Sequence, residues 1–330
     1  MMLRRSIYLN HTSFIFALVL IMTGCKKQDY ELPTAKSGLH NDVLKRTLGP
    51  NIVGQRIEFA YAMAILPDQG KLSSAKVEAT IAGATGTFLE NNSYYTNTSG
   101  VDVPVLVGSA AVTTGNTTTV TFNKDTSAAT LRYYYVIPPE AKGQTVSFKF
   151  SATSNNGETV TADLGPYTIS KMDMVRNLAV SNNANAYISI ENMAVYNSTD
   201  AAANAGKIDL VYLFRNITTS AFNHALVSPA ADPIYLPGVT LPAGVNRSSK
   251  IMKVFNLQDY NLALLQYGIY VDDRDFVEIN LANSPNYAIN LKGEAGAWVE
   301  TADGKYRAYI YINSVNAAGT AVISMKRYAM

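Results

Sequence analysis

GQTVSFKFSATSNNGETVT, residues 143–161, is the stretch that decides the fold class. Its apolar side chains occupy alternate positions from residue 145 to residue 152, which is typical of a strand with one face on a core and the other in water. Residues 155–158 supply a turn, and a second alternating run begins at Thr159. The stretch predicts a β-hairpin and indicates a chain built mainly of strands.

Comparable runs on the N-terminal side extend this hairpin into a domain. Residues 76–81, 117–122 and 131–137 also predict strands, and turn residues separate them. Their spacing fits an immunoglobulin-like β-sandwich from residue 43 to residue 170.

The C-terminal half predicts a second domain. Residues 171–184 lose the alternation and are interpreted as a linker, whereas residues 185–330 are again rich in strands. Within them, residues 208–214 are apolar on both faces apart from Asp209, which predicts a central strand. Short helices are predicted at residues 200–205 and 259–266. We therefore expect an all-β protein of two β-sandwich domains, because the chain is longer than the chains that usually fold around a single hydrophobic core.

The single cysteine lies directly after the most hydrophobic run of the chain. Arg4 and Arg5 form a short basic start, and residues 14–22 are apolar but too few to span a bilayer, as in a signal peptide. The Thr-Gly-Cys that follows resembles a bacterial lipobox, in which the cysteine sulfur takes a diacylglycerol. Residues 1–24 are therefore predicted to be a lipoprotein signal peptide, and Cys25 an acylated anchor. An ordinary secretory peptide or a buried thiol is the alternative.

Residues 25–42 are predicted to be a tether. They are polar and contain Pro33 and Gly38, so they lack the pattern of a packed element. We expect them to hold the folded body away from the membrane to which Cys25 would be bound.

Removal of the signal peptide would leave a chain without net charge. Of 27 lysines and arginines, Arg4 and Arg5 would be lost, so 25 basic residues would face 25 acidic ones. Such a chain, without blocks of Lys and Arg, lacks the positive surface that nucleic-acid binding needs. Nucleic acid is therefore excluded as a partner.

Residue types that carry catalysis are scarce. The mature chain has two histidines, His40 in the predicted tether and His224 in a loop-like stretch, so a Ser/His/Asp site would need one of them. Two histidines and an acylated cysteine cannot complete a closed zinc site, and no phosphate-binding glycine motif occurs. We expect no enzyme and no cofactor, although a carboxylate pair for glycoside hydrolysis stays open as an alternative.

One acidic cluster raises the question of a metal. Asp272, Asp273 and Asp275, with Glu278 nearby, could offer oxygen ligands to calcium. Their spacing does not match an EF-hand, Arg274 lies among them, and turns that link strands are commonly rich in Asp. A turn is predicted here, with a calcium site as the competing interpretation.

A second hairpin carries the single tryptophan. An Asp303-Gly304 turn would place Glu300 opposite Arg307 and Trp298 opposite Tyr309. One face then collects small and branched apolar side chains for a core. The other face collects the candidate ligand-binding residues Trp298, Glu300, Arg307, Tyr309 and Tyr311. Aromatic rings beside a charge pair predict an exposed platform for a sugar ring, and burial of Trp298 under a loop or the first domain is the alternative.

Several stretches resemble a family of bacterial surface proteins. They are LKRTLGPNIVGQRIEFAYAMAI (44–65), AYISIENMAVY (186–196) and AAANAGKIDLVYLF (201–214). Together with the lipobox they are similar to uncharacterised Bacteroidetes surface lipoproteins associated with glycan-uptake loci of the starch-utilisation type. The resemblance implies a lipid-anchored, two-domain protein of the outer membrane, exposed at the cell surface. Its implied partners are a polysaccharide or oligosaccharide and other outer-membrane uptake proteins.

These observations favour a non-catalytic glycan-binding lipoprotein, with the ligand on the C-terminal domain. A structural adhesin or pilus-like subunit is the alternative, which would be processed near Arg46 and assemble by strand addition. A glycoside hydrolase-type enzyme is the third possibility.

Overall fold

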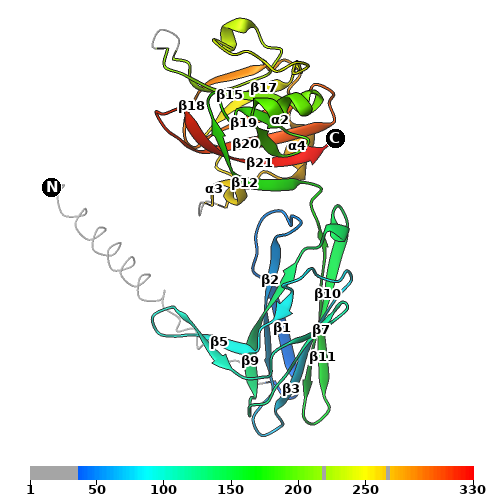
Figure 1. The fold of residues 1–330 in the computed structure, drawn as a ribbon. Coiled ribbons are helices and arrows are strands. Elements are labelled where there is room, and N and C mark those ends of the chain that lie inside the picture. The colour runs from blue at the N-terminus through cyan, green and yellow to red at the C-terminus, as the bar shows by residue number, and fades with distance from the viewer. Residues whose placement is uncertain (1–35, 218–220, 265–267) are drawn as a thin grey trace, which may run out of the picture. The chain divides into compact units, whose positions relative to one another are not determined.

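The computed structural model describes residues 36–217, 221–264 and 268–330. It is nearly all β, as the sequence predicts, and contains two β-sandwiches (Figure 1). No helix within the described ranges is long and apolar enough to cross a membrane. The predicted signal peptide, Cys25 and most of the predicted tether lie outside the described residues.

Two antiparallel sheets form the N-terminal sandwich. The first, called the β2 sheet, has the order β1 (His40–Lys45), β2 (Arg56–Ala64), β9 (Ala128–Val136) and β4 (Phe88–Leu89). The second, called the β10 sheet, has the order β11 (Thr159–Thr168), β10 (Thr145–Ser154), β3 (Leu72–Ala79), β8 (Thr117–Thr121) and β7 (Val112–Thr114). A short 3-10 helix, η1 (Pro139–Ala141), leads into β10. The first, second and fifth strands of an immunoglobulin domain are neighbours in the same way as β1, β2 and β9, which confirms the predicted fold class.

The core of this sandwich follows from the alternation in the sequence. Along β10, every second side chain from Val146 to Ala152 is buried, and along β2 the buried positions run from Ile57 to Met63 in the same rhythm. The ring of Phe59 lies 4.8 Å from that of Phe148 between their centroids. Each fully buried side chain of this size contributes about 1.5–3 kcal/mol to the stability of the fold.

The predicted end of the tether is wrong, because residues 40–42 already belong to β1.

The C-terminal sandwich also consists of two antiparallel sheets. The first, called the β20 sheet, has the order β12 (Asp173–Ser181), β21 (Thr320–Ala329), β20 (Tyr306–Val315), β19 (Ala295–Glu300) and β17 (Lys250–Phe255). The second, called the β15 sheet, has the order β14 (Ala194–Tyr196), β13 (Tyr187–Ser189), β15 (Leu210–Arg215), β16 (Asn223–Val227) and β18 (Tyr287–Leu291). The apolar run at residues 208–214 was predicted as a central strand, and β15 is the middle strand of its sheet.

Residues 171–184, predicted as a linker, mostly form β12, so that interpretation is wrong. This strand pairs with β21 from Asp173 to Ser181. Its register shifts between Val175 and Leu178, where Asn177 has a positive φ of 60°. A bulge adds a residue to one strand and breaks the period of two, which is why the pattern looked irregular in the sequence.

Short helices lie outside the sheets. They are α2 (Ser198–Ala203), α3 (Tyr260–Ala263) and α4 (Asp273–Glu278), with the 3-10 helices η2 (Ala205–Lys207) and η3 (Pro233–Tyr235). The predicted helices at residues 200–205 and 259–266 correspond to α2 and α3, although α2 begins earlier than predicted, at Ser198, with Asn197 as its N-cap. These helices and the loops around them cover the outer faces of the sandwich.

The hairpin of β19 and β20 has the predicted register. Trp298 lies opposite Tyr309 and Glu300 lies opposite Arg307. Ala297, Val299, Ala308, Ile310 and Ile312 share the core between the two sheets, as predicted. The position of the turn therefore fixed both the pairing and the division of the side chains into two faces.

The predicted exposure of the other face is wrong. Trp298 is 4% exposed, Tyr309 is fully buried and Tyr311 is 2% exposed. They pack in one apolar cluster with Leu262 of α3 and Phe276 of α4, and the Phe276 ring meets the Trp298 ring edge-on at 5.1 Å. A layer that contains α3 and α4 covers this face, so these rings cannot stack on a ligand.

The predicted ion pair of Glu300 and Arg307 is present, but its contacts hold the covering layer on the sheet. Glu300 accepts hydrogen bonds from Lys250 at 2.8 Å and from the Arg307 Nε at 3.0 Å. Arg307 also donates to the carbonyl oxygen of Phe276, at the covering helix α4. The bond from Lys250 holds the pKa of Glu300 below its usual value, and Arg307 adds to this shift.

We expect Trp298→Ala to lower the free energy of unfolding by about 3–5 kcal/mol, because it leaves a cavity under α4. Urea unfolding followed by far-UV circular dichroism measures this change. The control is Phe255→Ala, since Phe255 lies on the neighbouring strand β17 and is 68% exposed. If Trp298→Ala lowered the free energy of unfolding as little as the control does, the face of the sheet that carries Trp298 would be exposed rather than covered.

Glu300→Gln is expected to destabilise the protein at neutral pH by about 1.5–3 kcal/mol, the range for hydrogen bonds to charged groups. A carboxylate whose folded pKa is depressed adds stability above its unfolded pKa and loses it as the pH falls through the folded pKa. The difference in the free energy of unfolding between the variant and the wild type should therefore disappear below about pH 4. Glu278→Gln, in an ion pair whose side chains are 81% and 60% exposed, is the matched control and should have little effect. A difference that does not change with pH would contradict the assignment.

Candidate functional site

The predicted acidic cluster lies at the beginning of α4. Asp272 accepts hydrogen bonds from the backbone N–H groups of Arg274 and Asp275, and the Asp275 side chain accepts one from the Asp272 N–H at 2.8 Å. This reciprocal pattern is a capping box. Asp273 accepts from the backbone N–H of Lys171 at 2.9 Å. The three carboxylates thus bind backbone donors at the start of a helix, where a turn was predicted, and among the described residues no group of three or more metal-ligating side chains converges.

The two histidines lie in strands rather than in the tether or a loop. His224 belongs to β16, is 6% exposed, and its Nδ1 lies 2.7 Å from the Tyr212 hydroxyl oxygen. Burial lowers the pKa of His224, so this ring is neutral in a closed core. His40 lies in β1 at the edge of the β2 sheet.

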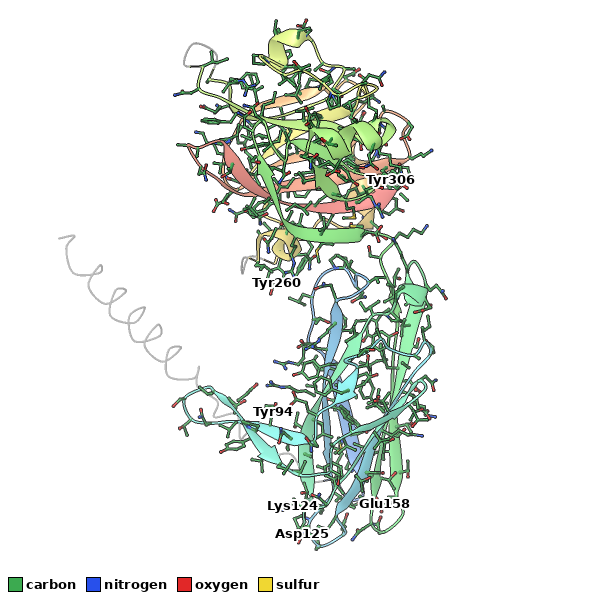
Figure 2. The ribbon with its side chains drawn as sticks, viewed as in Figure 1. Tyr94, Lys124, Asp125, Glu158, Tyr260 and Tyr306 are labelled. Carbon is green, nitrogen blue, oxygen red and sulfur yellow. The ribbon has the colours of Figure 1, made fainter. Side chains whose placement is uncertain are left out.

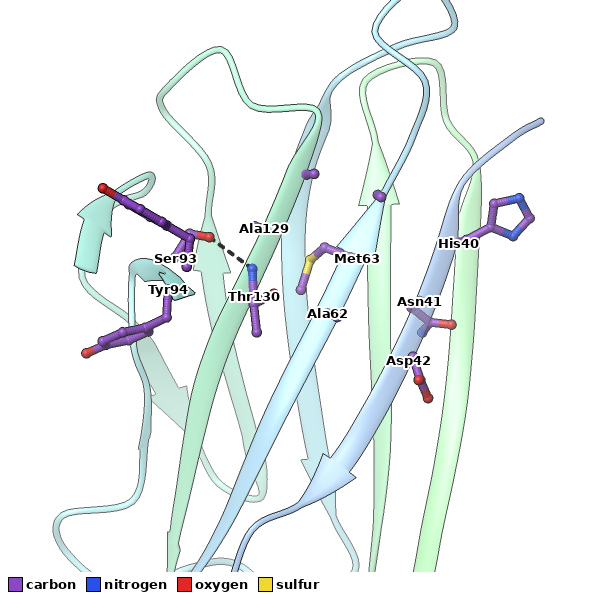
Figure 3. A pocket seen from close by; sticks show the side chains of 12 residues that line it. His40, Asn41, Asp42, Ala62, Met63, Ser93, Tyr94, Ala129 and Thr130 are labelled. Carbon is purple, nitrogen blue, oxygen red and sulfur yellow. Dashed lines mark hydrogen bonds between the residues drawn. The ribbon is translucent and has the colours of Figure 1, made fainter. Parts of the chain in front are cut away.

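A groove of about 480 Å³ lies beside His40, on the N-terminal sandwich (Figure 3). Its floor is the outer face of the β2 sheet. The registers place Asp42 opposite Ala62 and Ala62 opposite Thr130, so one row of side chains crosses three strands. Because the Ala62 side chain is short, the floor leaves space above it. The volume of the groove is in the range that is typical of pockets for small ligands.

One wall of the groove is β5 (Asn92–Thr96), which forms a hairpin with β6 (Asp102–Leu106). It joins neither of the two main sheets of this sandwich and extends away from it (Figure 1). The backbone N–H of Thr130 donates to the Ser93 hydroxyl oxygen at 3.0 Å and fastens the hairpin to β9 (Figure 3). The opposite wall is β1, which supplies His40, Asn41 and Asp42.

Two tyrosines of β5 line the groove. The Arg132 guanidinium carbon lies 3.7 Å from the centroid of the Tyr94 ring, and Arg132 forms an ion pair with Asp102 of β6. This cation–π contact holds Tyr94 on the outer side of the sandwich, where Figure 2 labels it. A hydrogen bond to Glu90 raises the pKa of Tyr94 to about 12, so its hydroxyl stays protonated. Tyr95 is 56% exposed.

The groove was not predicted from the sequence. Its residues come from four separate stretches, and the hairpin carries only a short alternating run with Pro104 in it. The adjacent pair Tyr94-Tyr95 was the signal that could have indicated it, because two large rings in an otherwise polar stretch are unusual for a loop.

Comparison with known proteins divides the chain into two parts. Residues 36–169 match the family model described as "Domain of unknown function (DUF4466)", and residues 170–330 match "Domain of unknown function (DUF8576)". Comparison with curated proteins gives no match.

Comparison with solved structures gives a strong similarity to a Parabacteroides protein. A DUF4466 family protein from Parabacteroides merdae is 51% identical, with a TM-score of 0.83 over 89% of this chain and 99% of that chain. A cohesin module from Clostridium perfringens (12% identity, TM-score 0.25, 41% of this chain and 98% of that chain) is too dissimilar to bear on the fold. The same holds for the major pilin subunit of Bacillus cereus (9%, 0.28, 86% and 62%). By the identity and coverage of its Parabacteroides relative, the chain belongs to the DUF4466 family.

Proposed function

We propose that this protein is a non-catalytic, lipid-anchored surface protein that binds a neutral glycan in the groove between β1 and the β5–β6 hairpin. The observation that carries the proposal is the composition of the groove. Short side chains form its floor, tyrosines line it on one side, and hydrogen-bonding groups line it on the other. The proposal keeps the glycan expected from the sequence but moves it from the C-terminal to the N-terminal sandwich.

Sugar rings have apolar faces that stack on aromatic rings and hydroxyl groups that need hydrogen-bond partners. Tyr95 offers an exposed ring for the first requirement. Asp42 and Thr130 offer acceptors and a donor for the second, on the same row of the sheet. Neither requirement depends on a metal or on net charge.

A binding role is favoured over hydrolysis by the carboxylates of the groove. Glycoside hydrolysis generally uses two carboxyl groups on either side of the bond that breaks. Of the described residues that line the groove, Asp42 alone carries one. We therefore propose that the protein captures a glycan for other outer-membrane uptake proteins, with Cys25 as the lipid anchor.

The groove is tested by filling it. We expect Ala62→Phe to weaken binding of a glycan, found on an array and measured by calorimetry, by at least about tenfold, or about 1.4 kcal/mol. Ala60→Phe is the matched control, because Ala60 lies two positions earlier on the same outer face of β2 but does not line the groove. Tyr95→Ala should also weaken binding, and Tyr260→Ala, at a 40% exposed tyrosine of α3, should not. An array without any bound glycan, or equal affinities for both alanine-to-phenylalanine variants, would overturn the proposal.

A pilus-like or adhesive subunit remains the second candidate, and β1 favours it. This strand of six residues is at the edge of the β2 sheet and pairs only with β2 within the described sheets. Arg46 follows it immediately. Cleavage after Arg46 would let a strand of another copy replace β1 by strand addition.

For this candidate, limited digestion with an arginine-specific protease should convert monomers into oligomers on gel filtration. Arg46→Gln should prevent both the cleavage and the assembly. Cleaved protein that stays monomeric would exclude assembly by replacement of β1.

A further inference from the structure

A lysine is buried in the apolar layer that covers the β20 sheet. Lys326 of β21 is 0% exposed and lies opposite Tyr309 of β20. Its side chain therefore points to the same side as Tyr309 and Trp298, toward the layer that contains α3 and α4. A buried ammonium group costs several kcal/mol unless it is fully paired, so this position needs a reason.

Three oxygen atoms surround the Lys326 nitrogen. The Nζ lies 2.6 Å from Asp259 Oδ2, 2.9 Å from Asn261 Oδ1 and 2.7 Å from the carbonyl oxygen of Val271. Asp259 is also 0% exposed. The backbone N–H groups of Leu262 and Val271 donate to its carboxylate and fix its orientation. Amine, carboxyl and amide groups thus meet in one place from which water is largely excluded.

We propose that Lys326 and Asn261 form an intramolecular isopeptide bond, with Asp259 as the group that moves the proton. The Lys326 Nζ gives its proton to Asp259 and attacks Asn261 Cγ. The new Nζ–Cγ bond forms and the Cγ–Nδ2 bond breaks. Asp259 returns this proton to the departing Nδ2 and accepts the second proton that Nζ loses as the amide forms, so one molecule of ammonia leaves, Nζ keeps the single amide hydrogen, and no oxidant or cofactor is needed.

Burial and proximity both support this step. Burial lowers the pKa of Lys326, which favours the neutral amine that can act as a nucleophile. A dry site also penalises the charged form of the amine. Because Nζ is already within hydrogen-bond distance of the amide oxygen, the carbonyl carbon lies close to the contact of about 3–3.5 Å from which such reactions proceed.

The bond would join residues that are 65 positions apart in the chain. It would fasten α3 to the strand β21 and so lock the covering layer onto the β20 sheet. This role is independent of the glycan proposed for the N-terminal groove.

Peptide mapping of the purified full chain tests the proposal. Trypsin cannot cleave after an acylated lysine, so residues 308–327 should remain in one peptide, joined to the peptide of residues 254–274 that contains Asn261. The joined peptide should weigh one ammonia less than its two parts. Lys250, which pairs with Glu300 at 2.8 Å but has a 43% exposed side chain, is the internal control and should be cleaved normally.

Variants separate the covalent role from a merely structural one. Asn261→Ala removes the carbonyl group at a partly exposed position, so it should fold and lose the joined peptide. Asn261→Asp should keep the joined peptide but lose one water instead of one ammonia. Complete cleavage after Lys326 in the wild type, with an unchanged mass, would overturn the proposal. A wild-type peptide joined through Asp259, with loss of water, would overturn the assignment to Asn261.

Discussion

Burial of both faces of the β20 sheet is the constraint on which the C-terminal sandwich depends. Ala308 and Ile310 point into the core between the sheets, while Tyr309 and Tyr311 point to the other side and are equally buried. A sheet with apolar side chains on both faces is unstable in water unless something covers its second face. The layer with α3 and α4 provides this cover, and the capping of α4 by Asp272 helps to hold it.

The polar contacts of this half of the protein follow from the same constraint. Arg307 connects Glu300 of the sheet to the carbonyl oxygen of Phe276, and Lys326 connects β21 to Asp259 beside α3. Each contact joins a strand to the covering layer. Gly296 makes the packing possible, because a Cβ atom there would lie 2.3 Å from the Tyr309 hydroxyl oxygen. The ionisable groups predicted as a ligand site thus serve to attach one layer to another.

Sequence patterns predicted the strands and the register of the β19–β20 hairpin, because the turn and the period of two fix which residues lie opposite each other. They did not predict what covers a face, since Phe276 and Leu262 reach Trp298 from distant stretches of the chain. They also missed β12, where a bulge at Asn177 interrupts the period, and the groove, whose walls are far apart in the sequence. Local periodicity carries information about pairing, whereas burial depends on tertiary contacts.

Different coverage of the two sandwiches supports our proposal of a ligand groove on the N-terminal one. The outer face of the β2 sheet carries Ala62 and Thr130 beside an exposed Tyr95, while the corresponding face of the β20 sheet is closed. Hydrogen–deuterium exchange of the whole protein, with and without the proposed glycan ligand, tests this proposal most directly. We predict slower exchange in β1, β2 and β5 and no change in β19 and β20. Protection of β19 and β20, with β1, β2 and β5 unchanged, would contradict it.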